Sequence, residues 1–102
     1  MNRIEYQYPI DLDWSNEEMM RVVSFFNAIE AYYEDQVERE TLMERYRQFK
    51  RIVPGKAEEK QTFKSFEKAS GYSSYHAVKD AQNHPDQKTV SYTHLRAHET
   101  RH

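Results

Sequence analysis

The last five residues of the chain, His98 to His102, read His-Glu-Thr-Arg-His. Two histidines one helical turn apart can bind a zinc ion, and a glutamate between them can act as the general base of a metallopeptidase. The types and spacing of His98, Glu99 and His102 therefore raise the question of whether this protein is a zinc enzyme.

A zinc peptidase also needs a third ligand and a packed helix around the motif. The nearest further histidine is His94, which a helix would place about 12 Å from His102. Zinc–nitrogen bonds measure about 2.0–2.1 Å, so one ion could not comfortably collect all three side chains. We therefore expect no metal site here.

The origin of this segment also argues against zinc chemistry. The stretch VSYTHLRAHET, from Val90 to Thr100, resembles the codon-by-codon translation of a widely used sequencing adapter. We interpret Val90–His102 as a fusion scar, which should be excluded from reasoning about fold and function. The His98, Glu99 and His102 motif is rejected as an artefact on this interpretation, and residues 90–102 are expected to form a non-native, unpacked tail.

The composition predicts one small helical domain. The chain has 102 residues, enough for a single domain, and 31% of them are charged, which fits amphipathic helices with solvated outer faces. Only 2 Gly and 3 Pro are present, too few for a sandwich of many turns. Residues 1–89 are expected to form this domain.

Charge and cysteine content limit the function classes. The absence of cysteine excludes disulfides and thiolate nucleophiles and predicts a reducing, cytoplasmic location. No stretch is typical of a signal peptide or of a membrane span. The net charge of −2 gives no general attraction to nucleic acid or to an anionic membrane. We expect no membrane partner, and nucleic acid is disfavoured as a partner.

The segment before the first helix is predicted to be an extended lead-in over residues 6–14. Pro9 disfavours a helical conformation at Tyr8. Ile10, Leu12 and Trp14 then alternate with aspartates, a two-residue period that predicts one apolar face against the core.

The first helix is predicted to begin at Ser15, because Ser15 and Glu18 form a capping box. Its apolar positions follow the helical period, and further apolar residues widen the stripe. The main positions are Met19, Val22, Val23, Phe26, Ile29 and Tyr33, and the widening residues are Met20, Phe25 and Tyr32.

Three further helices are predicted. The second is capped by Asp35 or Glu38 and stops at Pro54-Gly55. The third covers residues 56–70, with Gly71 as a left-handed C-cap. A short fourth helix is capped by Ser73 or Ser74 and directs Tyr75, Val78 and Ala81 inward. The expected fold class is all-α: a small up-down bundle of three main helices plus a short fourth helix.

Three blocks of this sequence resemble a known family. They read YQYPIDLDWSNEEM, FKRIVPGKAEEKQ and GYSSYHAVK. In this order and spacing they are similar to the small bacterial proteins of uncharacterised protein family (UPF) 0223. The resemblance covers Tyr6 to about Lys79. It implies an all-α bundle of cytosolic origin but no activity and no site residue, because no activity is established for the family.

The remaining polar clusters have simpler explanations than chemistry. Asp11, Asp13, Glu17 and Glu18 could form a cation site, but helix capping and dipole effects account for them better. Ser73 and His76 are too close in sequence to suggest a catalytic triad. Catalytic geometry would also need an orienting group and an oxyanion hole. We therefore expect no catalytic residue and no cofactor.

The function favoured by the sequence is a non-catalytic protein-interaction or regulatory module. The surplus of aromatic residues suggests an exposed interaction surface made of Tyr6, Tyr8, Trp14, Tyr72 and Tyr75. The alternative is nucleic-acid or phosphate binding through the basic face Arg45–Lys64, and an enzyme is the least favoured reading. The partner's identity and the oligomeric state stay open.

Overall fold

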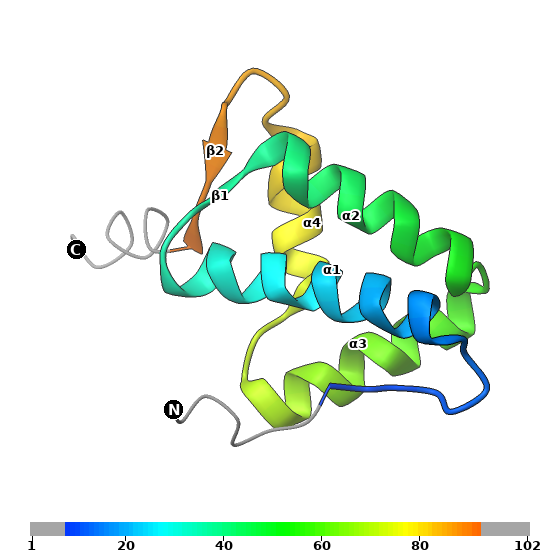
Figure 1. Cartoon of the computed structure of the whole chain (residues 1–102). Helices are drawn as coiled ribbons and strands as arrows, with labels where there is room; N and C mark the ends of the chain where they lie inside the picture. Colours follow the sequence, from blue (N-terminus) through cyan, green and yellow to red (C-terminus); the bar gives the residue numbers. More distant parts are fainter. Residues whose placement is uncertain (1–7, 93–102) are drawn as a thin grey trace.

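The computed structural model describes residues 8–92, and this part of the chain is mostly helical (Figure 1). The all-α fold class predicted from the sequence is thus confirmed. In chain order the described elements are α1 (Asn16–Glu34), β1 (Val37–Glu38), α2 (Arg39–Ile52), α3 (Lys56–Ser70), α4 (Ser74–Asn83) and β2 (Thr89–Val90).

Helix α1 begins at the predicted capping box. The Glu18 amide donates to Ser15 Oγ at 3.1 Å, and the Ser15 amide donates to the Glu18 carboxylate at 2.9 Å. Two N–H groups that the helix geometry would leave unpaired are thereby satisfied. The start of α1 is therefore set by local sequence.

The buried face of α1 is shifted from the predicted stripe. Phe25 and Tyr32, expected at its edge, are completely buried, whereas Met20 is 69% exposed. The buried phenylalanines of three helices meet here: Phe25 stacks on Phe49 of α2 at 4.9 Å, and Phe26 stacks on Phe66 of α3 at 4.4 Å. The core centres on these rings, so α1 is rotated to face them.

Helices α2 and α3 lie close to their predicted bounds. Glu38 occupies the N-cap position of α2, but its side chain makes no capping hydrogen bond. Helix α2 ends before Pro54, as predicted, and α3 begins directly after Gly55. Gly71 ends α3 with φ of 86°, the left-handed conformation that the sequence predicted there.

Helix α4 is capped by Ser73, whose hydroxyl accepts from the His76 amide at 3.1 Å. Val78 and Ala81 are buried as predicted, but Tyr75 is 62% exposed and the prediction that it faces inward is wrong. Ala77 is completely buried in its place. The helix turns its small side chains toward the core.

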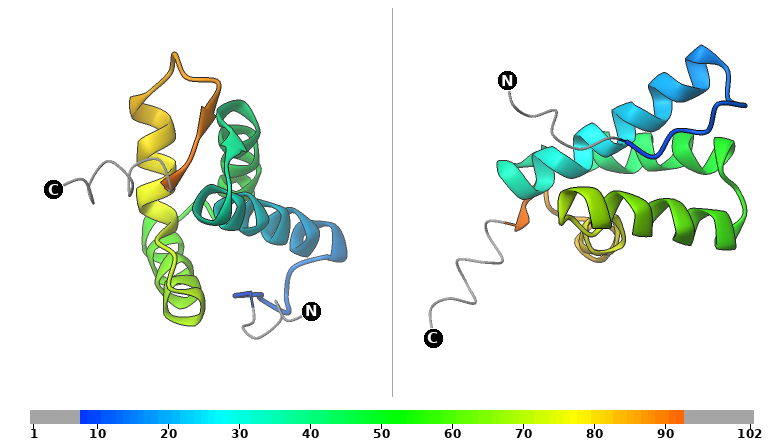
Figure 2. Two further views of the ribbon diagram at one scale, coloured as in Figure 1. Left: turned by 90° about the vertical axis from the view of Figure 1, so that its left-hand side faces the viewer. Right: turned by 90° about the horizontal axis from the view of Figure 1, so that it is seen from below.

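The helices do not all lie side by side as in a simple up-down bundle. Figure 2 shows α4 nearly end-on in the view that shows α1, α2 and α3 lengthwise, so α4 runs across the other three. Beside α4, β1 and β2 pair as a short antiparallel ribbon in which Val37 lies opposite Val90. This ribbon joins segments more than fifty residues apart, which local patterns do not reveal.

The prediction that the chain is unpacked from Val90 onward is wrong for its first three residues. Val90 is 4% exposed and belongs to β2. The Ser91 hydroxyl donates to the Asp35 carbonyl at 2.8 Å, and the Tyr92 ring lies 4.8 Å from that of Tyr33. The backbone of β1 and the rings at the end of α1 offer these residues partners. Residues 93–102, with His98, Glu99 and His102, lie outside the described residues.

Candidate functional site

The lead-in segment is fixed to α1 and α3 by Tyr8. Its ring stacks on Phe66 of α3 at 6.1 Å and on Phe26 of α1 at 6.4 Å. Its hydroxyl lies 2.9 Å from Asn27 Oδ1 and 2.9 Å from Glu30 Oε2. Tyr8 thus places the lead-in along one side of α1, running back toward the start of that helix (Figure 1).

A tight turn at the end of the lead-in directs Leu12 into solvent. The Trp14 amide donates to the Asp11 carbonyl at 3.0 Å, and the Asp13 amide donates to the Asp11 carboxylate at 2.9 Å. An aspartate that accepts from the backbone two residues on stabilises a turn. This turn interrupts the predicted alternation: Trp14 packs against the core, but Leu12 is 88% exposed. The prediction that Leu12 faces inward is wrong.

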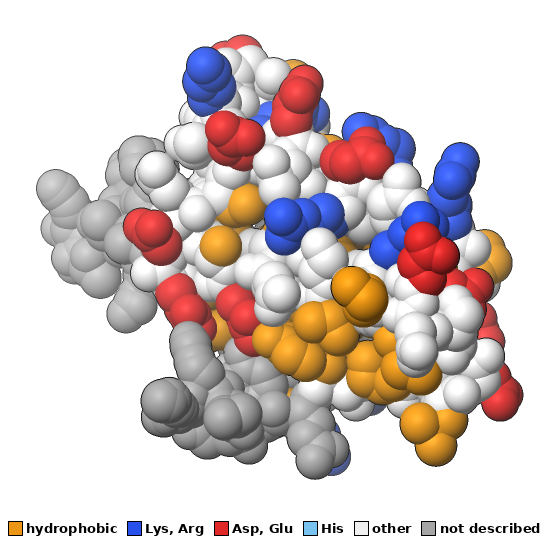
Figure 3. All heavy atoms as spheres, viewed as in Figure 1, with side chains coloured by type: hydrophobic (Ala, Val, Ile, Leu, Met, Phe, Trp, Pro, Cys, Tyr) orange, Lys and Arg blue, Asp and Glu red, His pale blue; other side chains and the backbone are white. Residues whose placement is uncertain are grey.

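The first turns of α1 add further apolar side chains to this region. Met20 is 69% exposed, and Met19 and Val23 are partly exposed. Met19 and Val23 lie one turn apart on the side of α1 that carries the contacts of Tyr8. Figure 3 shows hydrophobic side chains gathered over α1 and the lead-in. We call the surface formed by Leu12, Trp14, Met19, Met20 and Val23 the apolar patch.

The apolar patch is formed by the acidic segment of the chain, although Arg45 of α2 reaches the Ser24 carbonyl, next in sequence to Val23 of the patch. Residues 8–38 contain eight carboxylates and a single cation, Arg21, which pairs with Glu17 at 3.3 Å. Residues 39–70 contain nine cations and five carboxylates. The charges are therefore divided between the lead-in with α1 and the pair α2 and α3. The carboxylates nearest the patch in sequence are Asp11, Asp13, Glu17 and Glu18.

The aromatic residues predicted to form one interaction surface are spread over the molecule. Tyr6 lies outside the described residues, and Tyr8 and Trp14 are partly exposed on the lead-in. Tyr72 stacks on Tyr33 near the end of α1, with centroids 4.7 Å apart. Helix α1 has 19 residues and so is about 28 Å long, which separates Tyr72 from Trp14.

The fifth residue, Tyr75, lies on α4, where Lys79 Nζ sits 5.7 Å from its ring centre. Trp14, which the sequence analysis assigned to an interaction surface, is partly exposed and packs against the core. Leu12 and Met20, which are exposed, were not assigned to that surface. The Asp-x-Asp spacing around Leu12 was the available signal, since it is typical of a turn.

A partly buried hydrogen-bond chain joins α1 to α4. The Tyr32 hydroxyl donates to Asp80 Oδ2 at 2.6 Å, and Asp80 Oδ1 lies 2.8 Å from His84 Nδ1. Burial, followed by the hydrogen bond to Asp80, raises the pKa of Tyr32. The pKa of His84 is also raised, mainly by its contact with the Asp80 carbonyl. A tyrosine that stays protonated acts here as a hydrogen-bond donor between helices, not as a base.

The Ser73 and His76 pair is a helix cap in this structure. Its short contact joins the Ser73 hydroxyl to the His76 backbone amide, not to the imidazole ring. The Ser73 carbonyl accepts from the Tyr33 hydroxyl at 2.8 Å, and Ser74 is buried in the core. Burial is the main cause that raises the pKa of Tyr33, to about 12. These contacts give each residue a structural role.

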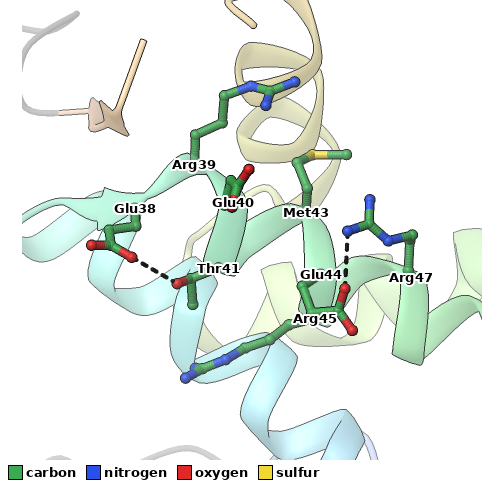
Figure 4. A pocket seen from close by; sticks show the side chains of 8 residues that line it. All are labelled: Glu38, Arg39, Glu40, Thr41, Met43, Glu44, Arg45 and Arg47. Atoms are coloured by element: carbon green, nitrogen blue, oxygen red, sulfur yellow. Dashed lines mark hydrogen bonds and ion pairs between the residues drawn. The ribbon is translucent and has the colours of Figure 1, made fainter.

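An open hollow of about 480 Å³ lies along the first turns of α2 (Figure 4). Its charged side chains do not converge on one point: Arg39 donates to the Ala81 carbonyl of α4, and Arg45 donates to the Ser24 carbonyl of α1. Figure 4 shows these two guanidinium groups pointing in opposite directions. Arg47 pairs with Glu44, whose pKa is lowered by Gln48 and Arg47. The arginines thus bind protein atoms.

Part of the predicted basic face is neutralised within the fold. Lys50 Nζ lies 2.7 Å from the Glu59 carboxylate, which also accepts from the Tyr46 hydroxyl at 2.7 Å. This contact joins α2 to α3. Four lysines recur at each turn of α3 and are exposed: Lys56, Lys60, Lys64 and Lys68.

Within residues 8–92, no group of three or more histidine and acidic side chains is arranged to hold a metal ion. In the same part of the chain, no helix has both the length and the apolarity needed to cross a membrane.

Comparison with known proteins gives a consistent family match. The model of the Uncharacterised protein family (UPF0223) matches residues 5–90. A UPF0223 protein of Staphylococcus saprophyticus is 74% identical over 86% of this chain and 96% of its own. UPF0223 proteins of Staphylococcus aureus strain MRSA252 and Staphylococcus haemolyticus are each 57% identical over 86% of this chain, covering 97% and 98% of their own lengths. The family match includes Val90 but ends before Ser91.

Proposed function

This chain belongs to the Uncharacterised protein family UPF0223, and from that premise we propose that it is a non-catalytic protein-interaction module that uses the apolar patch. The observation that carries the proposal is the exposure of Leu12 and Met20, at 88% and 69%, beside the partly exposed Trp14. A chain of this size gains nothing in stability from large apolar side chains in water.

The composition of the apolar patch supports this role. Tryptophan and methionine are enriched at protein interfaces, and methionine adapts its shape to a partner. Gathered exposed apolar side chains surrounded by polar ones are typical of interaction sites, whereas single ones are common on any surface. The chemistry of the other clusters supports a non-catalytic function. The Tyr32 and Tyr33 hydroxyls donate to Asp80 and to the Ser73 carbonyl, and the arginines of the α2 hollow point apart. We expect the protein to act in the cytoplasm, as its cysteine-free sequence predicts.

The test is a comparative capture experiment from a staphylococcal lysate. The full chain, the double variant Leu12→Asp/Met20→Asp and the variant Tyr75→Ser are immobilised separately, and retained proteins are identified by mass spectrometry. Tyr75 is the matched control because it is a large apolar residue, 62% exposed, on a different helix. We expect at least one protein to be retained by the wild type and by Tyr75→Ser but not by the double variant. The same retained set on all three would contradict the proposal.

A second candidate function is binding of a phosphate-rich polymer, such as single-stranded nucleic acid, along α3. It is favoured by the exposed row Lys56, Lys60, Lys64 and Lys68, in which successive lysines rise about 6 Å along the helix. Such contacts would be electrostatic and would weaken steeply with salt.

Fluorescence anisotropy with a labelled oligonucleotide tests this second candidate. We expect binding at low salt that Lys60→Glu/Lys64→Glu abolishes, while Lys79→Glu on α4 leaves it within about twofold. Absence of binding by the wild type at about 50 mM salt would remove this candidate.

A further inference from the structure

We propose that the apolar patch binds a cationic amphipathic helix of a partner protein. This inference rests on the proposed function and adds the chemistry of the partner. The juxtaposition that carries it is that the exposed apolar patch is formed by the acidic segment of the chain, residues 8–38.

The charge around the patch defines the first property of the partner. Asp11, Asp13 and Glu17 are exposed, and Arg21 is the one cation within residues 8–38. Complementary potentials across an interface speed association and exclude partners of like charge. A partner segment with lysines or arginines beside its apolar residues matches this surface, whereas an acidic segment or an anionic membrane is repelled by it.

The form of the patch defines the second property. The patch presents side chains from a helix and a turn, not an unpaired strand edge to which an extended peptide could add. Recognition through side chains alone is typical of an amphipathic helix lying in an apolar groove, with anchors every three or four residues. Leu12 and Met20 would contact those anchors, and the aspartates beside Leu12 would contact the flanking cations.

A second copy of this chain is a poorer occupant of the same surface. A two-fold dimer places one patch against an identical one, since such an interface is self-complementary. It would therefore bring Asp11, Asp13 and Glu17 of each copy close to the same carboxylates of the other. Like charges facing each other disfavour that arrangement.

The experiment uses three synthetic helical peptides of equal length. All carry the same leucines, and the polar positions hold lysine in the first, glutamine in the second and glutamate in the third. Each is titrated into the ¹⁵N-labelled full chain, and amide chemical shifts are followed by NMR. We expect the lysine peptide to bind at least about fivefold more tightly than the glutamine peptide. The shifts should centre on residues 11–23, and the glutamate peptide should not bind.

Two variants separate the apolar from the charged contribution. Met20→Ser should weaken the binding of the lysine peptide and of the glutamine peptide to the same extent. Asp11→Asn/Asp13→Asn should weaken the binding of the lysine peptide alone, toward the affinity of the glutamine peptide. Asparagine keeps the turn at residues 11–14 because its side chain makes the same local hydrogen bond. Tyr75→Ser, again the matched control, should change the affinity for neither peptide. The amide spectrum of each variant shows whether it is folded.

The outcomes distinguish this inference from the proposed function. Equal binding of the lysine and glutamine peptides would overturn the cationic partner but leave an apolar interaction surface. Shifts centred away from residues 11–23, or no binding by any peptide, would overturn the inference, while the lysate capture still tests the proposed function independently. Self-association of the wild type in sedimentation experiments, lost in Met20→Ser, would show that a second copy covers the patch instead.

Discussion

At the scale of single residues, Tyr32 of α1 stabilises the contact between α1 and α4. Its side chain is completely buried, and its hydroxyl donates to Asp80 at 2.6 Å. We predict that Tyr32→Phe lowers the free energy of unfolding by about 1.5–3 kcal/mol, because a hydrogen bond to a charged group is lost inside the fold. Urea unfolding followed by circular dichroism measures this change.

The matched control for Tyr32→Phe is Tyr75→Phe. Tyr75 is 62% exposed, so removal of its hydroxyl should change the free energy of unfolding by less than about 0.5 kcal/mol. If both substitutions have the same small effect, the contact between Tyr32 and Asp80 does not contribute to stability.

Residue-scale prediction from sequence succeeded where the determinants are local. The capping box of Ser15 and Glu18 and the left-handed Gly71 were both predicted and confirmed. It failed for Leu12, Met20 and Tyr75, which were expected to face inward. Periodicity shows which apolar residues lie on the same side of a helix, but packing against other elements decides which side faces the core. These three misses include two members of the candidate site.

At the scale of elements, Gly71 determines how α3 is joined to α4. Its φ of 86° is a conformation that residues with a side chain rarely adopt, although no atom lies within 4 Å of an added Cβ. We predict that Gly71→Ala destabilises the protein by about 1–2 kcal/mol through backbone strain alone. Chemical denaturation is the measurement.

Gly55 provides the matched comparison, since it has φ of −74° at the start of α3. An added Cβ there would make ordinary contact with the Glu58 side chain at 3.6 Å. Gly55→Ala should therefore change stability by no more than about 0.5 kcal/mol in either direction, or stabilise slightly by restricting the unfolded chain. Equal destabilisation by both alanines would show that conformation at Gly71 is not the cause.

The helices were predictable as elements, but their arrangement was not. The bounds of α3 follow from the turn at Pro54-Gly55 and from Gly71, which are local signals. The pairing of Val37 with Val90 and the crossing of α4 over the other helices depend on contacts between distant segments. Two-residue strands carry too little pattern to be recognised in a sequence.

At the scale of the whole molecule, buried tyrosines limit stability in alkaline solution. Burial raises the pKa of Tyr33 to about 12 and also raises the pKa values of Tyr32 and Tyr46. The contribution of these protonated tyrosines to the free energy of unfolding is complete below their pKa in the unfolded chain, about 10. It is lost as the pH rises through their raised pKa values in the folded protein. We predict that the free energy of unfolding falls above pH 10 by up to about 1.4 kcal/mol per pH unit for each of the three.

Urea unfolding between pH 8 and pH 11 checks this prediction. Tyr33→Phe should reduce the steepness of the decline above pH 10, because one group with a raised pKa is removed, whereas Tyr75→Phe should leave it unchanged. Stability that stays constant from pH 9 to pH 11 would be incompatible with three tyrosines held in the protonated form.

The C-terminal boundary of the folded unit is the last whole-molecule question. The adapter interpretation placed this boundary before Val90, but Val90 is buried and Tyr92 contacts the rings of Tyr32 and Tyr33.

We predict that a chain ending at Lys88 is about 2–4 kcal/mol less stable than one ending at Tyr92, because a buried valine and a packed aromatic ring are lost. A chain ending at Tyr92 should match the full chain within about 0.5 kcal/mol, since residues 93–102 fall within the stretch interpreted as a fusion scar. Equal stability of the chain ending at Lys88 and the full chain would restore the earlier boundary. Loss of stability on removing residues 93–102 alone would instead show that these residues belong to the domain, whatever the origin of their sequence.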